Sequence, residues 1–171
     1  MAMFGGQDAK SNFERTVKLV ETVIQGFNLD PVKNRLNTTD GSTAWALMRG
    51  SAEVLIFLNP AKEQNQQNYM RAVAPCWRLP DQNHEKIYRR LLELNSKDLW
   101  GTAFGLLSPE GKPNIVDAVL VTERTTTDLD RGEVEEILNN IGATADFYDD
   151  KLVQEFGGTR ISDIPRGGGG N

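Results

Sequence analysis

The chain has few of the residues on which enzymes and metal sites depend. Its 171 residues include one cysteine, Cys76, and one histidine, His84. A single cysteine excludes an internal disulfide, and one Cys with one His cannot complete the usual ligand set of a zinc site. Phosphate-binding motifs of the types G-x-x-x-x-G-K-[ST] and G-x-G-x-x-G are also missing. We therefore expect no enzyme activity, no metal and no cofactor.

The groups left for catalysis have simpler structural interpretations. His84 falls on the polar opening of a predicted helix, and Cys76 falls in an apolar strand pattern typical of a buried small hydrophobe. Asp146, Asp149 and Asp150 lack the alternating ligands and central glycine of a calcium loop, so a solvated helix face explains them. The alternative is an enzyme with an unfamiliar carboxylate site.

Charge and hydropathy argue against two classes of partner. The net charge of −5 disfavours duplex nucleic acid, which requires a basic surface. The longest apolar run, Val54 to Leu58, is too short to cross a bilayer, and the first ten residues lack the pattern of a signal peptide. We expect a cytoplasmic protein that binds neither nucleic acid nor membrane.

The negative charge is concentrated near the end of the chain. Residues 128–155 hold nine acids and two bases, a net charge of −7, whereas the remainder holds 15 acids and 17 bases, or +2. A solvated helix face explains this window. The alternative is an acidic patch, including Glu135 and Glu136, that steers a basic partner.

Apolar periodicity predicts three helices and five strands. The first helix is expected to begin at Ser11, where Ser11 to Glu14 fits a capping box, and the last at Asp130, with Asp130 as its cap. The chain then reads α-β-β-β-α-β-β-α, which is an α+β fold. The expected strands are 43–49, 52–58, 69–78, 99–107 and 115–123, and the middle helix follows Pro80.

Three features within these elements stand out. Pro75 lies inside a strand and cannot donate a ladder hydrogen bond, so we expect an edge position or a bulge. Gly142 interrupts the last helix at a cost of about 1 kcal/mol relative to alanine, which allows a bend or break. The short middle helix has two apolar stripes, so it needs cover on more than one side, from its own chain or from a second subunit.

The domain is expected to occupy residues 11–158. Residues 1–10 are expected to be a flexible N-terminus. Residues 159–171, which include the glycine run 167–170, are expected to be a disordered tail. The segment Ala61–Asn68 is a polar insert.

Several local phrases carry a resemblance to a known family. They are VAPCWRLP, IYRRLLELN, LWGTAF and DFYDDKLVQEFGG, within residues 11–158. The chain resembles the YbjN family, within the type III secretion chaperone-like fold. This resemblance implies a five-stranded antiparallel sheet with the two long helices on one face. It also implies a homodimer formed through the middle helix and the adjoining strand, and an extended peptide as the partner.

The predicted function is that of a non-enzymatic chaperone-like or adaptor protein that binds a protein or peptide client. The alternative is a regulatory or assembly subunit that binds a folded partner through the acidic last helix. The family is also described in terms of sensory-transduction regulation, which leaves the biochemical act undefined. Expected dimer contacts are Ile87, Leu91, Leu92 and Trp100. Expected partner-binding residues are Tyr69, Trp77, Tyr88, Glu135 and Glu136.

Overall fold

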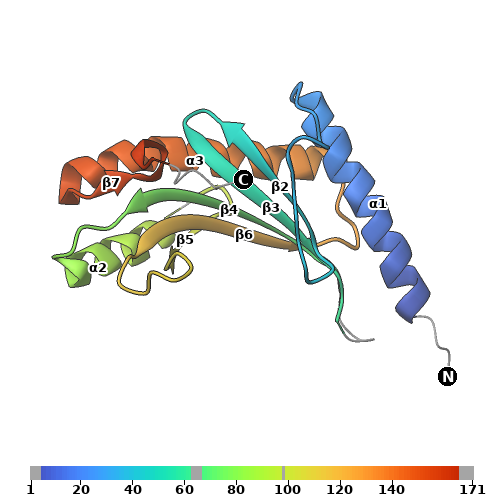
Figure 1. Cartoon of the computed structure of the whole chain (residues 1–171), viewed down its shortest axis with the longest axis horizontal. Helices are drawn as coiled ribbons and strands as arrows, with labels where there is room; N and C mark the ends of the chain where they lie inside the picture. The colour runs from blue at the N-terminus through green and yellow to red at the C-terminus, as the bar shows by residue number, and fades with distance from the viewer. Residues whose placement is uncertain (1–4, 63–66, 98, 166–171) are drawn as a thin grey trace.

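The computed structural model describes residues 5–62, 67–97 and 99–165 (Figure 1). It has three α-helices around one antiparallel sheet. The helices are α1 (Gly5–Gly26), α2 (His84–Asn95) and α3 (Arg131–Phe156), and a 3₁₀ turn, η1, covers Ile161–Asp163. The strands are β1 (Arg35–Leu36), β2 (Thr43–Arg49), β3 (Ala52–Asn59), β4 (Tyr69–Arg78), β5 (Ala103–Leu107), β6 (Asp117–Thr125) and β7 (Thr159–Arg160).

The α+β class is confirmed, but the predicted five-stranded sheet and element order are wrong. Among the described residues the sheet has seven strands in the order β1-β2-β3-β4-β6-β5, with β7 pairing to β4, and the pairings are antiparallel. The two strands missed from the sequence, β1 and β7, have two residues each. Segments that short cannot show the alternation by which strands are recognised.

The core lies on one face of the sheet. Along β3, Val54, Ile56 and Leu58 are fully buried, whereas the intervening Leu55 and Phe57 are half-buried. The fully buried set forms one cluster with apolar residues of α1, α2 and α3, so the helices cover this face. The opposite face carries the half-buried set.

The last helix begins as predicted and the first does not. Asp130 caps α3, because its carboxylate accepts a hydrogen bond of 2.9 Å from the backbone N–H of Glu133. In contrast, α1 already begins at Gly5, so Ser11 lies inside the helix. A capping pattern does not prevent a helix from starting earlier in the sequence. Here α1 also includes the residues that precede the predicted cap.

Gly142 causes no break in α3. The helix runs continuously from Arg131 to Phe156, and Gly142 is buried where the helix crosses β2. A Cβ atom at this position would lie 2.6 Å from the Cβ of Arg49. The glycine is therefore a point of close contact between helix and sheet.

The predicted strand 99–107 begins later than expected. Residues before Ala103 form a turn in which Trp100 and Gly101 have φ of 51° and 77°, and the Thr102 N–H donates to the Leu99 carbonyl at 3.1 Å. Two successive positive φ angles are incompatible with a strand. The side chain of Asn95 bonds both the N–H and the carbonyl of Phe104, which joins the end of α2 to β5.

Pro75 produces a bulge, one of the two outcomes predicted for it. The register of β4 against β6 shifts between Pro75 and Trp77, although β4 is an inner strand. After α3, β7 pairs with Trp77 and Arg78 of β4 and is followed by η1. The glycine run 167–170 lies outside the described residues.

Within the described residues, no helix is long and apolar enough to cross a membrane.

Candidate functional site

The face of the sheet away from the core cluster carries an apolar groove of about 390 Å³. Neighbouring strands contribute side chains in rows. One row aligns Leu55, Val73 and Val121 across β3, β4 and β6, since Leu55 pairs with Val73 and Val73 with Val121. The groove is lined by Leu55, Phe57, Asn59, Tyr69, Arg71, Val73, Gly105, Leu106, Leu107, Val119 and Val121.

Gly105 helps to make the groove hollow. It faces Val119 across the β5–β6 pairing, and a Cβ at this position would stand 3.7 Å from the methyl groups of Val119 and Val121. Because glycine has no side chain there, the groove keeps open space above these two valines, of which Val121 is half-buried and Val119 is buried. The groove therefore presents branched apolar surface between strands.

One end of the groove is polar. Arg71 is exposed and stands opposite Glu123 in the β4–β6 register, next to Phe57 in the β3–β4 register. A basic and an acidic side chain beside rows of apolar side chains can contact the side chains of an extended polypeptide. The groove offers no nucleophile with an adjacent base.

Two of the four predicted dimer contacts are exposed. Leu92 is 69% exposed and Trp100 is 59% exposed, whereas Ile87 and Leu91 are buried within the chain. Leu106 and Leu107, on the neighbouring β5, are about half exposed. Exposed apolar side chains therefore lie on α2, in the turn before β5 and on β5, and Leu92 and Trp100 are the predicted contacts among them.

The predicted partner-binding residues are not brought together. Tyr69 lines the open groove, but Trp77 is fully buried in the core, where its Nε1–H donates to the Gly157 carbonyl at 2.8 Å. Tyr88 is half-buried on α2. Glu135 and Glu136 are exposed on α3.

The sequence analysis missed the apolar side chains that line the groove. Leu55, Phe57 and Val121 were assigned to strands but not to a site. Because nearly every position of β3 is apolar, the sequence predicted that both faces of this strand would be covered. The helices cover one face only, and the sequence pattern does not reveal that difference.

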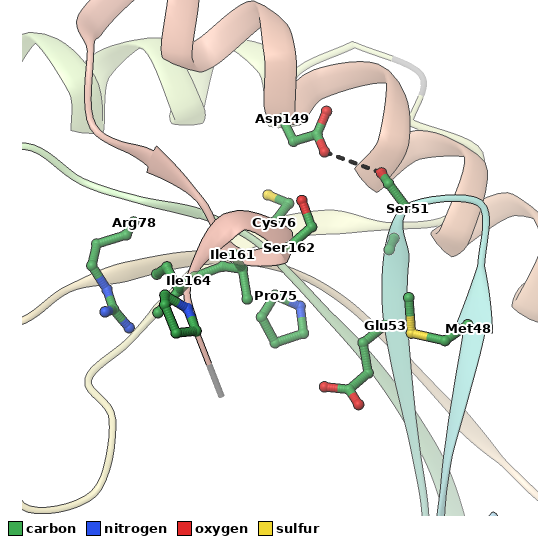
Figure 2. Close-up of a pocket in the computed structure, with 12 residues that line it drawn as sticks. Met48, Ser51, Glu53, Pro75, Cys76, Arg78, Asp149, Ile161, Ser162 and Ile164 are labelled. Atoms are coloured by element: carbon green, nitrogen blue, oxygen red, sulfur yellow. Dashed lines mark hydrogen bonds between the residues drawn. The ribbon is translucent and has the colours of Figure 1, made fainter. Parts of the chain in front are cut away.

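A second cavity, of about 300 Å³, lies between the tip of the β2–β3 hairpin and the segment after β7 (Figure 2). Cys76 and Asp149 line it, and both are buried. Burial raises the pKa of the Cys76 thiol to about 12, so this thiol stays protonated and unreactive at neutral pH. The predicted role of Cys76 as a buried small hydrophobe is confirmed.

Asp149 differs from its neighbour Asp146. Burial, followed by the charges of Asp150 and Asp146, raises the pKa of the Asp149 carboxyl, although the Asp150 N–H donates to it at 2.6 Å. Hydrogen bonds from the hydroxyl and the N–H of Ser51 lower the pKa of Asp146. The two acids therefore have opposite effects on the pH dependence of stability.

We expect Asp149→Asn to raise the melting temperature at pH 7, by about 2–4 °C for each kcal/mol gained in a chain of this size. The folded carboxyl has a pKa above its ordinary value of 3.8, so its ionised form costs stability at neutral pH. As the pH falls through the folded pKa, the folded state binds the proton first and this cost disappears. The gain should therefore shrink towards pH 4, as thermal unfolding at both pH values would show. Glu136→Gln, at an exposed acid of the same helix, is the control, and a lower melting temperature for Asp149→Asn at pH 7 would contradict the expectation.

Metal binding has no support in the part of the chain that the structure describes, where no group of three or more His, Cys, Asp or Glu side chains could hold an ion. The described sites are thus apolar surfaces and a cavity lined by acids.

Comparison with known proteins identifies the family. The family model YbjN, described as "Putative bacterial sensory transduction regulator", matches residues 16–154.

The chain belongs to the YbjN family. It is similar to a chain of a solved structure titled "Crystal Structure of the ExsC-ExsE Complex", with a TM-score of 0.57, 17% sequence identity, and coverage of 81% of this chain and 94% of that chain. No curated protein matches the sequence significantly. At this identity the structural likeness shows the fold.

Proposed function

We propose that this YbjN protein is a non-enzymatic chaperone-like or adaptor protein that holds an extended segment of a protein partner. The observation that carries the proposal is the uncovered apolar groove, in which Leu55, Phe57 and Val121 stay partly exposed after the chain has folded. A similar fold is found in a structure titled as a complex, which supports a role in holding another protein. A cytoplasmic location fits this role.

The groove suits an extended segment better than a folded surface. Its apolar side chains come from alternate positions of adjacent strands, so pockets for successive side chains repeat across the sheet. The outer strand β5 has a pairing partner on one side only in the sheet order, and its other edge can add backbone hydrogen bonds. Both features match the recognition of a peptide as an additional strand.

Phe57→Glu should reduce binding to an array of extended apolar decapeptides by at least about tenfold, equivalent to about 1.4 kcal/mol. The change places a charge on the floor of the groove, where a bound apolar side chain would have to desolvate it. Phe147→Glu is the matched control, because Phe147 is 51% exposed on α3, outside the groove. Equal loss in the two variants, or no binding by the wild type, would contradict the proposal.

We further propose a homodimer through the apolar surface of α2 and β5. Light scattering should give twice the chain mass of 19.0 kDa for the wild type, and a single chain mass for Leu92→Glu. Leu92 is 69% exposed in one chain, so the change should disturb association and leave the fold intact. Val32→Glu, at a residue 77% exposed elsewhere, should stay dimeric. A monomeric wild type would remove the homodimer from the proposal.

A further inference from the structure

The chain that follows α3 covers the edge of β4 that β3 leaves. Pairing between β3 and β4 ends with Leu55 and Val73, and β7 pairs with β4 at Trp77 and Arg78. Because β6 pairs with these same two residues on the other side, β7 lies on the β3 side of β4. The 3₁₀ turn η1 follows and also packs against β4. We call Thr159–Pro165 the strap.

The strap makes few contacts with the core. Its β7 ladder has two residue pairs, and no residue of η1 is buried. Ile161 and Ile164 are half-buried, and the second cavity of about 300 Å³ lies between the strap and the β2–β3 hairpin (Figure 2). A side chain that borders such a cavity lacks part of the packing of a core residue. The strap can therefore detach by local opening while the sheet stays folded.

An ion pair joins the strap to α3. The guanidinium of Arg160 donates to Asp150 at 2.9 Å, and it donates to Asp163, within the strap, at 2.8 and 3.1 Å. The side chain of Asp150 is 73% exposed, so water competes with this pair and its contribution to stability is small. Such a pair selects which side chain lies beside α3 more than it strengthens the contact.

Two glycines precede the strap. Gly157 and Gly158 have φ of 79° and 84°, which residues with a Cβ atom rarely adopt. The Nε1–H of Trp77 donates to the Gly157 carbonyl and anchors the chain there. A Cβ at Gly158 would lie 2.3 Å from the carbonyl oxygen of Arg78, so the chain passes close over β4. The rotations of Gly158 then allow the strap to turn away from β4 while α3 stays in place.

From these features we propose that the β4 edge beneath the strap binds an extended segment of a protein partner, and that the strap occupies this site when the partner is absent. The strap indicates the chemistry of the partner. It has an arginine that reaches Asp150, followed by branched apolar residues that reach the cavity wall at Pro75. The backbone of an incoming segment would pair with Trp77 and Arg78 as β7 does. A segment that filled more of the cavity would gain packing that the strap lacks.

The strap should lower the apparent affinity for such a segment. A partner binds only those molecules in which the strap has detached, so its apparent affinity falls by that fraction. Arg160→Glu should raise the fraction, because it removes the pair with Asp150 and places like charges beside Asp150 and Asp163. This site is at an edge of β4 and does not require the open groove to bind anything.

The test is a titration of the isotope-labelled full chain with N-acetyl-Thr-Arg-Ile-Ser-Asp-Ile-Pro-amide, which has the sequence of the strap, followed by two-dimensional NMR. We expect saturable shifts at the amides of Trp77 and Arg78, with an affinity at least about tenfold higher in Arg160→Glu than in the wild type. Ile161→Ser, which removes apolar contact from the strap, is a second variant and should act in the same direction. The peptide with glutamate in place of arginine should bind Arg160→Glu at least about tenfold more weakly, because it meets Asp150 with a like charge.

Controls separate the alternatives. Lys18→Glu makes the same change of charge at an exposed residue of α1, away from the strap, and should leave the affinity within about twofold of the wild type (Figure 1). Equal affinity of the wild type and Arg160→Glu would overturn the proposal, and so would the absence of shifts at Trp77 in both strap variants. If unlabelled wild-type chain caused the same shifts as the peptide, the occupant would be the strap of a second copy and a different partner would be excluded. Shifts confined to Phe57 and Val121 would assign the peptide to the open groove and would also overturn the proposal.

Discussion

Trp77→Ala should destabilise the protein by about 3–5 kcal/mol, the range for removing a large buried aromatic side chain. Trp77 is fully buried, and its ring centroid lies 6.1 Å from that of Phe156. Its Nε1–H also donates to the Gly157 carbonyl, which fixes the chain directly after α3. Alanine would leave a cavity and release that carbonyl.

Thermal and urea unfolding would measure this effect. For a chain of this size the melting temperature should fall by about 6–20 °C. Phe147→Ala is the matched control, because Phe147 is 51% exposed on α3, outside the proposed dimer surface, and its loss should cost no more than about 0.5 kcal/mol. Similar losses in the two variants would show that Trp77 does not have the position described.

Gly142→Ala should destabilise the protein by about 1–3 kcal/mol, although helix propensity alone predicts a gain of about 1 kcal/mol. The added Cβ would lie 2.6 Å from the Cβ of Arg49, so α3 and β2 would have to move apart. Packing therefore opposes propensity at this position, and we expect packing to dominate.

Gly132→Ala provides the comparison within the same helix. Gly132 is exposed in the first turn of α3, and its added Cβ would meet only an oxygen of Asp130 at 3.4 Å. This variant should be neutral or more stable in urea unfolding, by up to about 1 kcal/mol. If Gly142→Ala also gained stability, the close crossing of α3 over β2 would be wrong.

The sequence predicted those elements whose patterns are long and bounded by clear signals. The strands Thr43–Arg49 and Tyr69–Arg78 have the predicted bounds, and α3 has the predicted cap. Local physics determines such elements, because alternation, helical spacing and capping act over neighbouring residues. The turn at Trp100 and Gly101 could not be predicted in the same way, because a positive φ at tryptophan depends on tertiary contacts.

The candidate site was harder to predict than the fold. The sequence showed both apolar stripes of α2, but it did not show which of them packs against the rest of the chain. The structure buries Ile87 and Leu91 and leaves Leu92 exposed. Trp77 was a candidate for partner contact on the basis of residue type, and its burial became clear only from the packing of α3 and the segment after it.

Pairing between β3 and β4 ends at Leu55 and Val73, and this affects the local dynamics of the β2–β3 hairpin tip. Beyond Leu55, the hairpin tip is fastened to α3 by side chains, through Ser51 to Asp146 and Arg49 to Asn139, and not by a backbone ladder to β4. Amide protons at the tip should therefore exchange with solvent through a small local opening that leaves the sheet folded.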